Sequence, residues 1–172
     1  MSKGHFSLRE AALIGVWAAM TFAVKLVLAP LANVELVSLM LCVFTVAMGF
    51  RSGLTAAFVF TMLTVCESAY YGAGDWIAAY FINWPLLTVL TWLFLKNKNQ
   101  EIRAAAVLGL FGFFFDLSSA AIKLILFGRI YALTYLISGI PFDAIHGASN
   151  FITGLFLFRP LCSQLEKLRD KF

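Results

Sequence analysis

The chain has 172 residues, of which 62% are hydrophobic and only 13% are charged. This composition leaves too little polar surface to cover a soluble globule, but it suits several helices that cross a lipid bilayer. The net charge of +4 could indicate a nucleic-acid partner, but the basic residues lie where membrane topology would place them. We therefore predict an all-α integral membrane protein that binds no nucleic acid.

Six apolar runs divide the sequence, each near the roughly 20 residues needed to cross a bilayer, the second being the shortest. They cover residues 9–29, 34–50, 53–71, 76–95, 103–127 and 141–160. The polar N-terminus lacks a small-residue cleavage site after a short apolar core, so we expect the first run to be a retained span. No internal repeat is evident, so residues 1–172 are expected to form one compact six-helix domain.

The basic residues predict how the helices are oriented. If both termini lie on one side of the membrane, ten of the thirteen Lys and Arg residues fall on that side. By the positive-inside rule this side is the cytoplasm, so we expect a multi-pass protein of a prokaryotic plasma membrane with both termini inside. Glu35, Glu67, Asp75 and Asp143 map to the opposite, outer half, and Asp116 lies near the middle of the fifth run. We therefore expect a site in the outer half. The apolar segment 128–140 at that end either covers a cavity or forms a short interfacial helix.

The first apolar run carries a small residue at every fourth position. These residues are Ala11, Gly15, Ala19 and Ala23. Four-residue steps stay close to one stripe of a helix, and small residues let another helix approach closely within a membrane. The stripe can pack against helices of this chain or against a partner protein.

Two helix faces near the outer end combine polar and aromatic side chains. Tyr80, Asn83 and Trp84 are related by three- and four-residue steps, and an amide facing lipid would be costly, so we predict a pocket there. Asp143, His146 and Asn150 have the same spacing in the sixth run. The alternatives are an interfacial aromatic belt for the aromatic residues and hydrogen bonds between helices for the polar ones.

We predict that the substrate-binding residues gather at this outer end. The set is Asn33, Glu35, Glu67, Tyr71, Trp76, Tyr80, Asn83, Trp84, Lys123, Tyr131, Asp143, His146 and Asn150. A single intramembrane histidine with scattered acids is a weak metal signal, and no CxxC pair is present, so we expect neither metal nor cofactor. The sequence contains no HExxH, GxSxG or Walker loop, which predicts that the chain is not an enzyme and has no ATP site.

The chain resembles the substrate-binding S components of energy-coupling-factor (ECF) vitamin transporters, a group of ABC importers. A basic N-terminus leads into the stripe Gly15-xxx-Ala19-xxx-Ala23, a short loop covers residues 30–36, and six compact spans have polar outer ends. The resemblance implies that the first helix docks onto a transmembrane coupling subunit, which sits on two cytoplasmic ATPases. It also implies capture of a vitamin from outside, followed by toppling of the S component when it docks.

The resemblance extends to the group that includes cobalamin-specific members, so cobalamin is the vitamin expected first. Pantothenate, hydroxymethylpyrimidine, riboflavin, folate and thiamine stay open. Two other classes of function are alternatives: an intramembrane enzyme that uses Glu67, Asp116, Asp143 and His146, and a membrane assembly factor without a small ligand.

Overall fold

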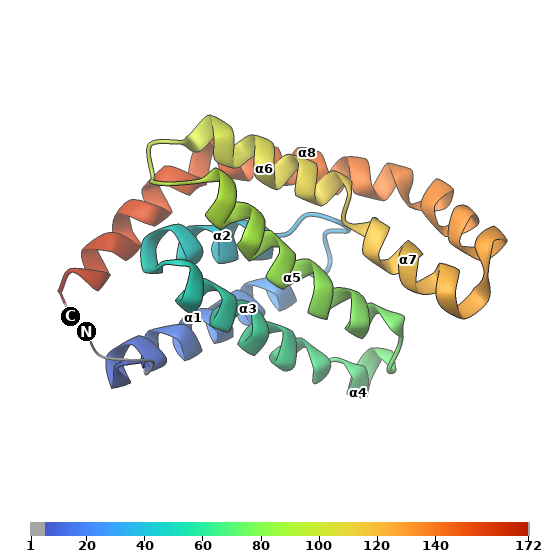
Figure 1. Cartoon of the computed structure of the whole chain (residues 1–172), viewed down its shortest axis with the longest axis horizontal. Coiled ribbons are helices and arrows are strands. Elements are labelled where there is room, and N and C mark those ends of the chain that lie inside the picture. The colour runs from blue at the N-terminus through green and yellow to red at the C-terminus, as the bar shows by residue number, and fades with distance from the viewer. Residues whose placement is uncertain (1–5, 172) are drawn as a thin grey trace.

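The computed structural model describes residues 6–171, except for the side chain of Tyr71, and all of its regular elements are helices. Figure 1 shows the arrangement. The helices are α1 (Leu8–Leu28), α2 (Val37–Met48), α3 (Phe50–Val65), α4 (Ser68–Tyr71), α5 (Asp75–Phe94), α6 (Glu101–Phe113), α7 (Asp116–Phe127) and α8 (Arg129–Arg169). The prediction of an all-α fold is therefore confirmed.

Four helical stretches are long and apolar enough to cross a membrane. They are Leu8–Leu28, Phe50–Tyr70, Asp75–Phe94 and Glu101–Phe127. These stretches support a membrane location, because an apolar helix of about 20 residues matches the thickness of the hydrocarbon core. Six spans with cytoplasmic termini stay a prediction.

The short helix α2 is the centre of the bundle. Ten of its twelve residues are buried, and it packs against α1, α3, α5, α6 and α8. A helix that is apolar all round is stable when it is enclosed on every side, which explains its position. It ends at Gly49, whose φ of 88° lies in the left-handed region and lets the chain turn directly into α3.

Helices α6 and α8 approach each other most closely through glycine. A Cβ atom on Gly147 would lie 2.9 Å from the carbonyl oxygen of Gly109, and one on Gly112 would lie 3.0 Å from the backbone nitrogen of Gly147. Figure 1 shows the two helices side by side along the length of α6. Small residues permit this backbone contact, which provides van der Waals attraction where lipid removes the hydrophobic driving force.

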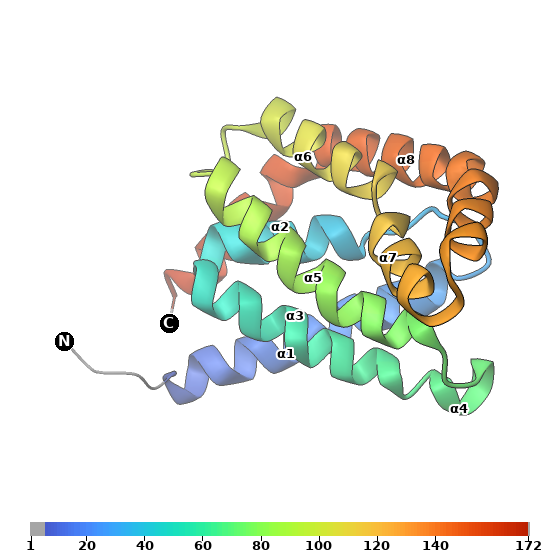
Figure 2. The same cartoon turned by 45° about the vertical axis from the view of Figure 1, so that its right-hand side comes forward.

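The fifth apolar run and the segment after it differ from the sequence prediction. The run is interrupted at Phe114 and Phe115, which separate α6 from α7. The segment 128–140 forms no loop, because α8 begins at Arg129 directly after Gly128, whose φ is 86°. Figure 2 shows that the first, orange part of α8 runs at a steep angle to the rest. Pro141 and Pro160 lie inside this helix, and proline is a common cause of such bends.

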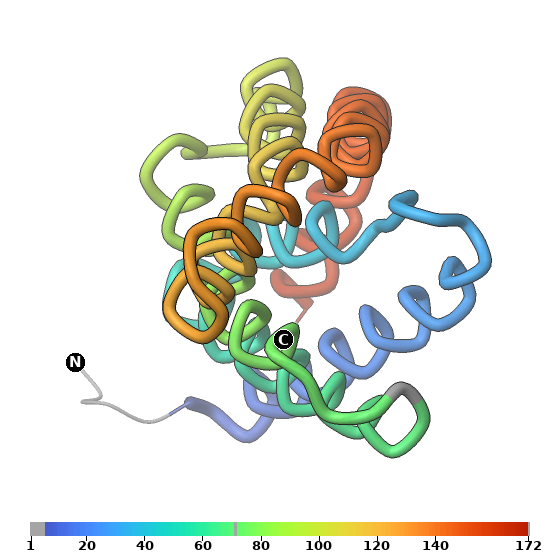
Figure 3. Tube along the Cα trace, turned by 90° about the vertical axis from the view of Figure 1, so that its right-hand side faces the viewer, coloured from blue at the N-terminus to red at the C-terminus, as the bar shows by residue number. Residues whose placement is uncertain are grey.

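The two ends of the bundle are different. The start of α1 and the end of α8 lie near each other at one end (Figure 1). Figure 3 looks onto the other end, which is framed by the connection 29–36, by α4 and by the hairpin of α7 and α8. The candidate site lies at this second end.

Replacing Gly147 by Ala should destabilise the bundle by about 1–3 kcal/mol, because the added methyl group meets backbone atoms of α6 that cannot move aside. The matched control is Gly15→Ala in α1, where the methyl group meets nothing within 4 Å. Unfolding of both variants in detergent, monitored by circular dichroism, would measure the difference. Equal stability of Gly147→Ala and the parent would contradict the close α6–α8 contact.

Candidate ligand-binding site

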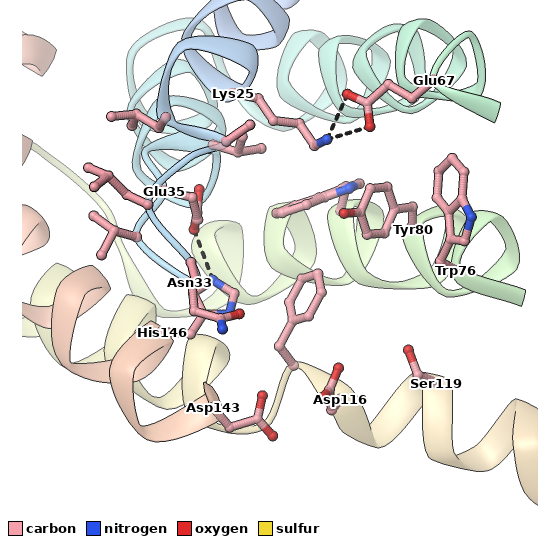
Figure 4. Close-up of a pocket in the computed structure, with 18 of the residues that line it drawn as sticks. Lys25, Asn33, Glu35, Glu67, Trp76, Tyr80, Asp116, Ser119, Asp143 and His146 are labelled. Atoms are coloured by element: carbon pink, nitrogen blue, oxygen red, sulfur yellow. Dashed lines mark hydrogen bonds and ion pairs between the residues drawn. The ribbon is translucent and has the colours of Figure 1, made fainter. Parts of the chain in front are cut away.

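A cavity of about 490 Å³ lies at the end of the bundle opposite the termini. Figure 4 shows most of the side chains around it. They come from the last turn of α1, the connection 29–36, the first residue of α2, the residue before α4, the first half of α5, the α6–α7 break, α7 and α8. Its volume lies within the range of roughly 300–1,000 Å³ that is typical of sites for small ligands.

An ion pair closes one side of the cavity. Lys25 Nζ lies 2.6 Å from both carboxylate oxygens of Glu67, and the Glu67 side chain is only 9% exposed. The same ammonium group lies 5.9 Å from the centroid of the Tyr80 ring. The pair therefore joins the end of α1 to the segment after α3 and places a cation beside an aromatic ring.

The connection 29–36 forms a second side and is held by α8. Glu35 Oε1 lies 3.1 Å from His146 Nε2, and Glu35 Oε2 accepts a 2.9 Å hydrogen bond from the backbone N–H of Ser38. Burial raises the pKa of the Glu35 carboxyl, but its contacts with His146 and Ser38 lower the pKa by more, so it lies below its ordinary value. Asn33 adopts a left-handed φ of 58°, which asparagine tolerates well.

Aromatic rings form a continuous wall between these two sides. The Tyr80 ring contacts Trp76 and Trp84, each at 5.5 Å between centroids. The Phe115 ring contacts Trp84 at 5.3 Å and His146 at 5.0 Å. Most of these contacts are edge-to-face, which fixes the orientation of the rings, and a planar ligand can stack on the exposed face of a single ring.

Two carboxylates lie on the remaining side, where α7 meets α8. Asp116 begins α7, and its Oδ1 atom accepts a 3.0 Å hydrogen bond from the Tyr135 hydroxyl. Asp143 lies beside it (Figure 4). Gly139 permits this approach of α8, because a Cβ atom there would lie 3.0 Å from Asp116 Oδ2.

The structure brings most of the predicted substrate-binding residues together around this cavity. Those that line it are Asn33, Glu35, Glu67, Trp76, Tyr80, Trp84, Asp143 and His146. Asp143 and His146 are three residues apart in α8, and Tyr80 and Trp84 are four residues apart in α5. Both pairs line this cavity, as their spacing predicts. Tyr71 was also predicted, but its side chain lies outside the described part of the structure.

Four predicted residues lie elsewhere. Asn83 lines a separate apolar groove, and its Nδ2 atom donates a 3.1 Å hydrogen bond to the carbonyl oxygen of Phe115. Lys123 forms an ion pair with Asp75 outside the cavity lining. Tyr131 is 53% exposed on the first turn of α8. Asn150 is 1% exposed, and its amide lies against Gly112 of α6.

Several cavity residues were not among the predicted ones. Lys25, Asp116, Ser119 and Tyr135 all line the space. Asp116 had a usable signal, because a carboxylate in the middle of an apolar run needs a partner or a polar cavity. Lys25 lies near the end of its apolar run, where a lysine can extend to the interface, and its partner Glu67 lies 42 positions away in the sequence.

The predicted docking stripe lies on the outside of α1. Ala11, Gly15, Ala19 and Ala23 are all exposed, and the space beside the Gly15 Cα atom is open. The buried residues of α1 are instead Ile14, Ala18 and Thr21. The bundle's own helices therefore leave the stripe uncovered.

Comparisons with known proteins found no matching family model, no matching curated protein and no matching solved structure. A functional proposal for this chain therefore depends on its residues and geometry.

The cavity predicts different effects for two polar residues that the sequence treats alike. His146→Ala should weaken ligand binding by roughly 1–3 kcal/mol if His146 hydrogen-bonds the ligand. Asn83→Ala should leave affinity close to that of the parent but lower the free energy of unfolding by about 0.5–1.5 kcal/mol, because the Phe115 carbonyl loses its partner. Isothermal titration and thermal unfolding of both variants would separate the effects, and an unchanged affinity of His146→Ala would remove it from the binding site.

Proposed function

We propose that this chain is the substrate-binding S component of an ECF-type importer that captures a water-soluble vitamin. The observation that carries the proposal is the combination of two features in one small helical bundle. One end holds a cavity with polar and aromatic walls, and α1 presents an uncovered stripe of small residues. A ligand-binding subunit that relies on another protein for energy needs both features.

The cavity supports the capture of a small polar molecule. Its aromatic wall suits a planar ring, while Glu35, His146, Asp116 and Asp143 offer hydrogen-bonding groups around it. In the proposed topology of six spans with cytoplasmic termini, this end faces the outside of a prokaryotic cell. The ligand would then enter from the external medium.

The stripe supports docking onto a transmembrane coupling subunit. Close van der Waals contact is the main attraction between helices in lipid, and residues without bulky side chains permit it. The resemblance to S components implies a partner complex with two cytoplasmic ATPases, which agrees with the lack of a nucleotide-binding loop in the sequence of this chain. Docking would then topple the S component and release the ligand inward.

The size of the cavity bears on which vitamin is bound. A volume of about 490 Å³ lies in the lower half of the range for drug-sized ligands. It therefore favours pantothenate, hydroxymethylpyrimidine, riboflavin, folate or thiamine over cobalamin, whose corrin ring and nucleotide loop make it much larger. Cobalamin nevertheless belongs among the vitamins to be screened.

A vitamin that binds only the folded state should raise the unfolding temperature, since the stabilisation is RT ln(1 + [L]/Kd), about 2.7 kcal/mol at 100 times Kd. The experiment is to screen the vitamins named above against the purified full chain and to identify any molecule that copurifies with it. At least one should stabilise the protein. If none does, and none copurifies, the assembly-factor alternative would be favoured.

Gly15→Leu and Ala19→Leu should reduce uptake by the assembled transporter while the isolated subunit keeps its ligand affinity. Both positions face outward, so leucine fits without disturbing the fold but holds a docking helix away. The control is Ala106→Leu, the same change on an exposed position of α6. Uptake in vesicles that contain the coupling subunit and ATPases is the measurement, and uptake unaffected by both variants would argue against docking through this stripe.

A further inference from the structure

The side chains around the cavity carry an excess of negative charge. Its lining contains four acids, Glu35, Glu67, Asp116 and Asp143. Among the described residues of the lining, Lys25 is the only lysine, His146 is the only histidine, and there is no arginine. Even a protonated His146 leaves the acids in excess. The cavity is therefore an unfavourable place for an anion.

The excess of negative charge is concentrated where α7 meets α8. Lys25 is matched by Glu67 at 2.6 Å, and His146 is matched by Glu35 at 3.1 Å. Asp116 and Asp143 lie near each other (Figure 4), and neither forms an ion pair with a lysine or arginine in the part of the chain that is described. Two carboxylates held together in a partly buried space repel each other, and this repulsion is removed when one takes up a proton or when a cation binds beside them.

The aromatic wall of the cavity also favours a positively charged ligand. The rings of Trp76, Tyr80, Trp84 and Phe115 line the cavity and contact one another. The face of an aromatic ring attracts a cation, and this attraction increases when water is excluded. Lys25, lying 5.9 Å from the centre of the Tyr80 ring, shows that a positive group already lies beside this wall.

We propose that the ligand is a small organic cation that contains a flat ring. Its positive charge lies near Asp116 and Asp143, and its ring stacks on the wall formed by Tyr80, Trp84 and Phe115. This inference rests on the proposed function and narrows it, because vitamins that carry a carboxylate do not fit the charge of the cavity.

The test uses the purified full chain in lipid nanodiscs and four probes. Thiamine carries a fixed positive charge, hydroxymethylpyrimidine shares its pyrimidine ring without that charge, riboflavin is neutral and pantothenate is an anion. Binding is read from tryptophan fluorescence and from the shift in unfolding temperature. We expect thiamine to bind at least about tenfold more tightly than the other three, since charge-assisted contacts are the stronger ones. Its affinity should also fall as salt is added.

The variants Asp116→Asn and Asp143→Asn keep the shape of each side chain and remove its charge. Each should lower thiamine affinity by roughly fivefold or more and leave hydroxymethylpyrimidine affinity nearly unchanged. The control is Asp170→Asn, which removes an exposed carboxylate at the other end of the bundle.

Tighter binding of pantothenate or riboflavin than of thiamine, or a thiamine affinity that ignores both salt and the two variants, would overturn the inference. The proposed function would survive that result, because a vitamin would still be bound. Failure of every vitamin to bind, together with failure of the chain to assemble with a coupling subunit, would overturn the proposed function as well.

Discussion

The enclosed helix α2 is the constraint on which the cavity depends. At 1.5 Å per residue its twelve residues span about 18 Å, whereas the 21 residues of α1 span about 32 Å. Its last turn meets the end of the bundle that holds the termini, because the Ala47 carbonyl accepts a hydrogen bond from Arg169. Helix α2 therefore stops short of the other end of the bundle. Val37, its first residue, lies in the cavity lining there. The site occupies the space that a full-length helix would fill.

The charged groups around this space follow from the same arrangement. The connection that replaces the missing turns of α2 carries Glu35, which is held by His146. The break between α6 and α7 brings a second carboxylate, Asp116, to the cavity. Asn83 stabilises the break by donating to the Phe115 carbonyl, since a freed backbone acceptor inside a membrane needs a partner. Irregular backbone and acidic side chains thus occur together where they line a polar space.

The residues that could be predicted from the sequence are those whose position depends on one helix alone. Asp143 and His146 share a face because they are three residues apart, and Tyr80 and Trp84 share one because they are four apart. Lys25 could not be placed, because its role depends on packing of α1 against the segment after α3. The cost of burying an amide predicts that Asn83 lies in the pocket, but its partner is the Phe115 carbonyl, which is freed by a helix break that the apolar run does not reveal. Periodicity could likewise not show that residues 129–140 belong to the same helix as 141–160, since an apolar loop and an interfacial helix share one composition.

Helix α1 is the element that connects the two halves of the proposed function. Its exposed stripe ends at Ala23, and two residues later Lys25 lies in the cavity lining, paired with Glu67. The chain then continues into the connection that carries Glu35. A ligand held between the acids and the aromatic wall would contact the end of the same helix that presents the docking stripe. Ligand binding can influence docking only if the ligand binds the docked and free states with different affinity. Helix α1 can produce such a difference, because it contributes both to the cavity lining and to the proposed docking surface.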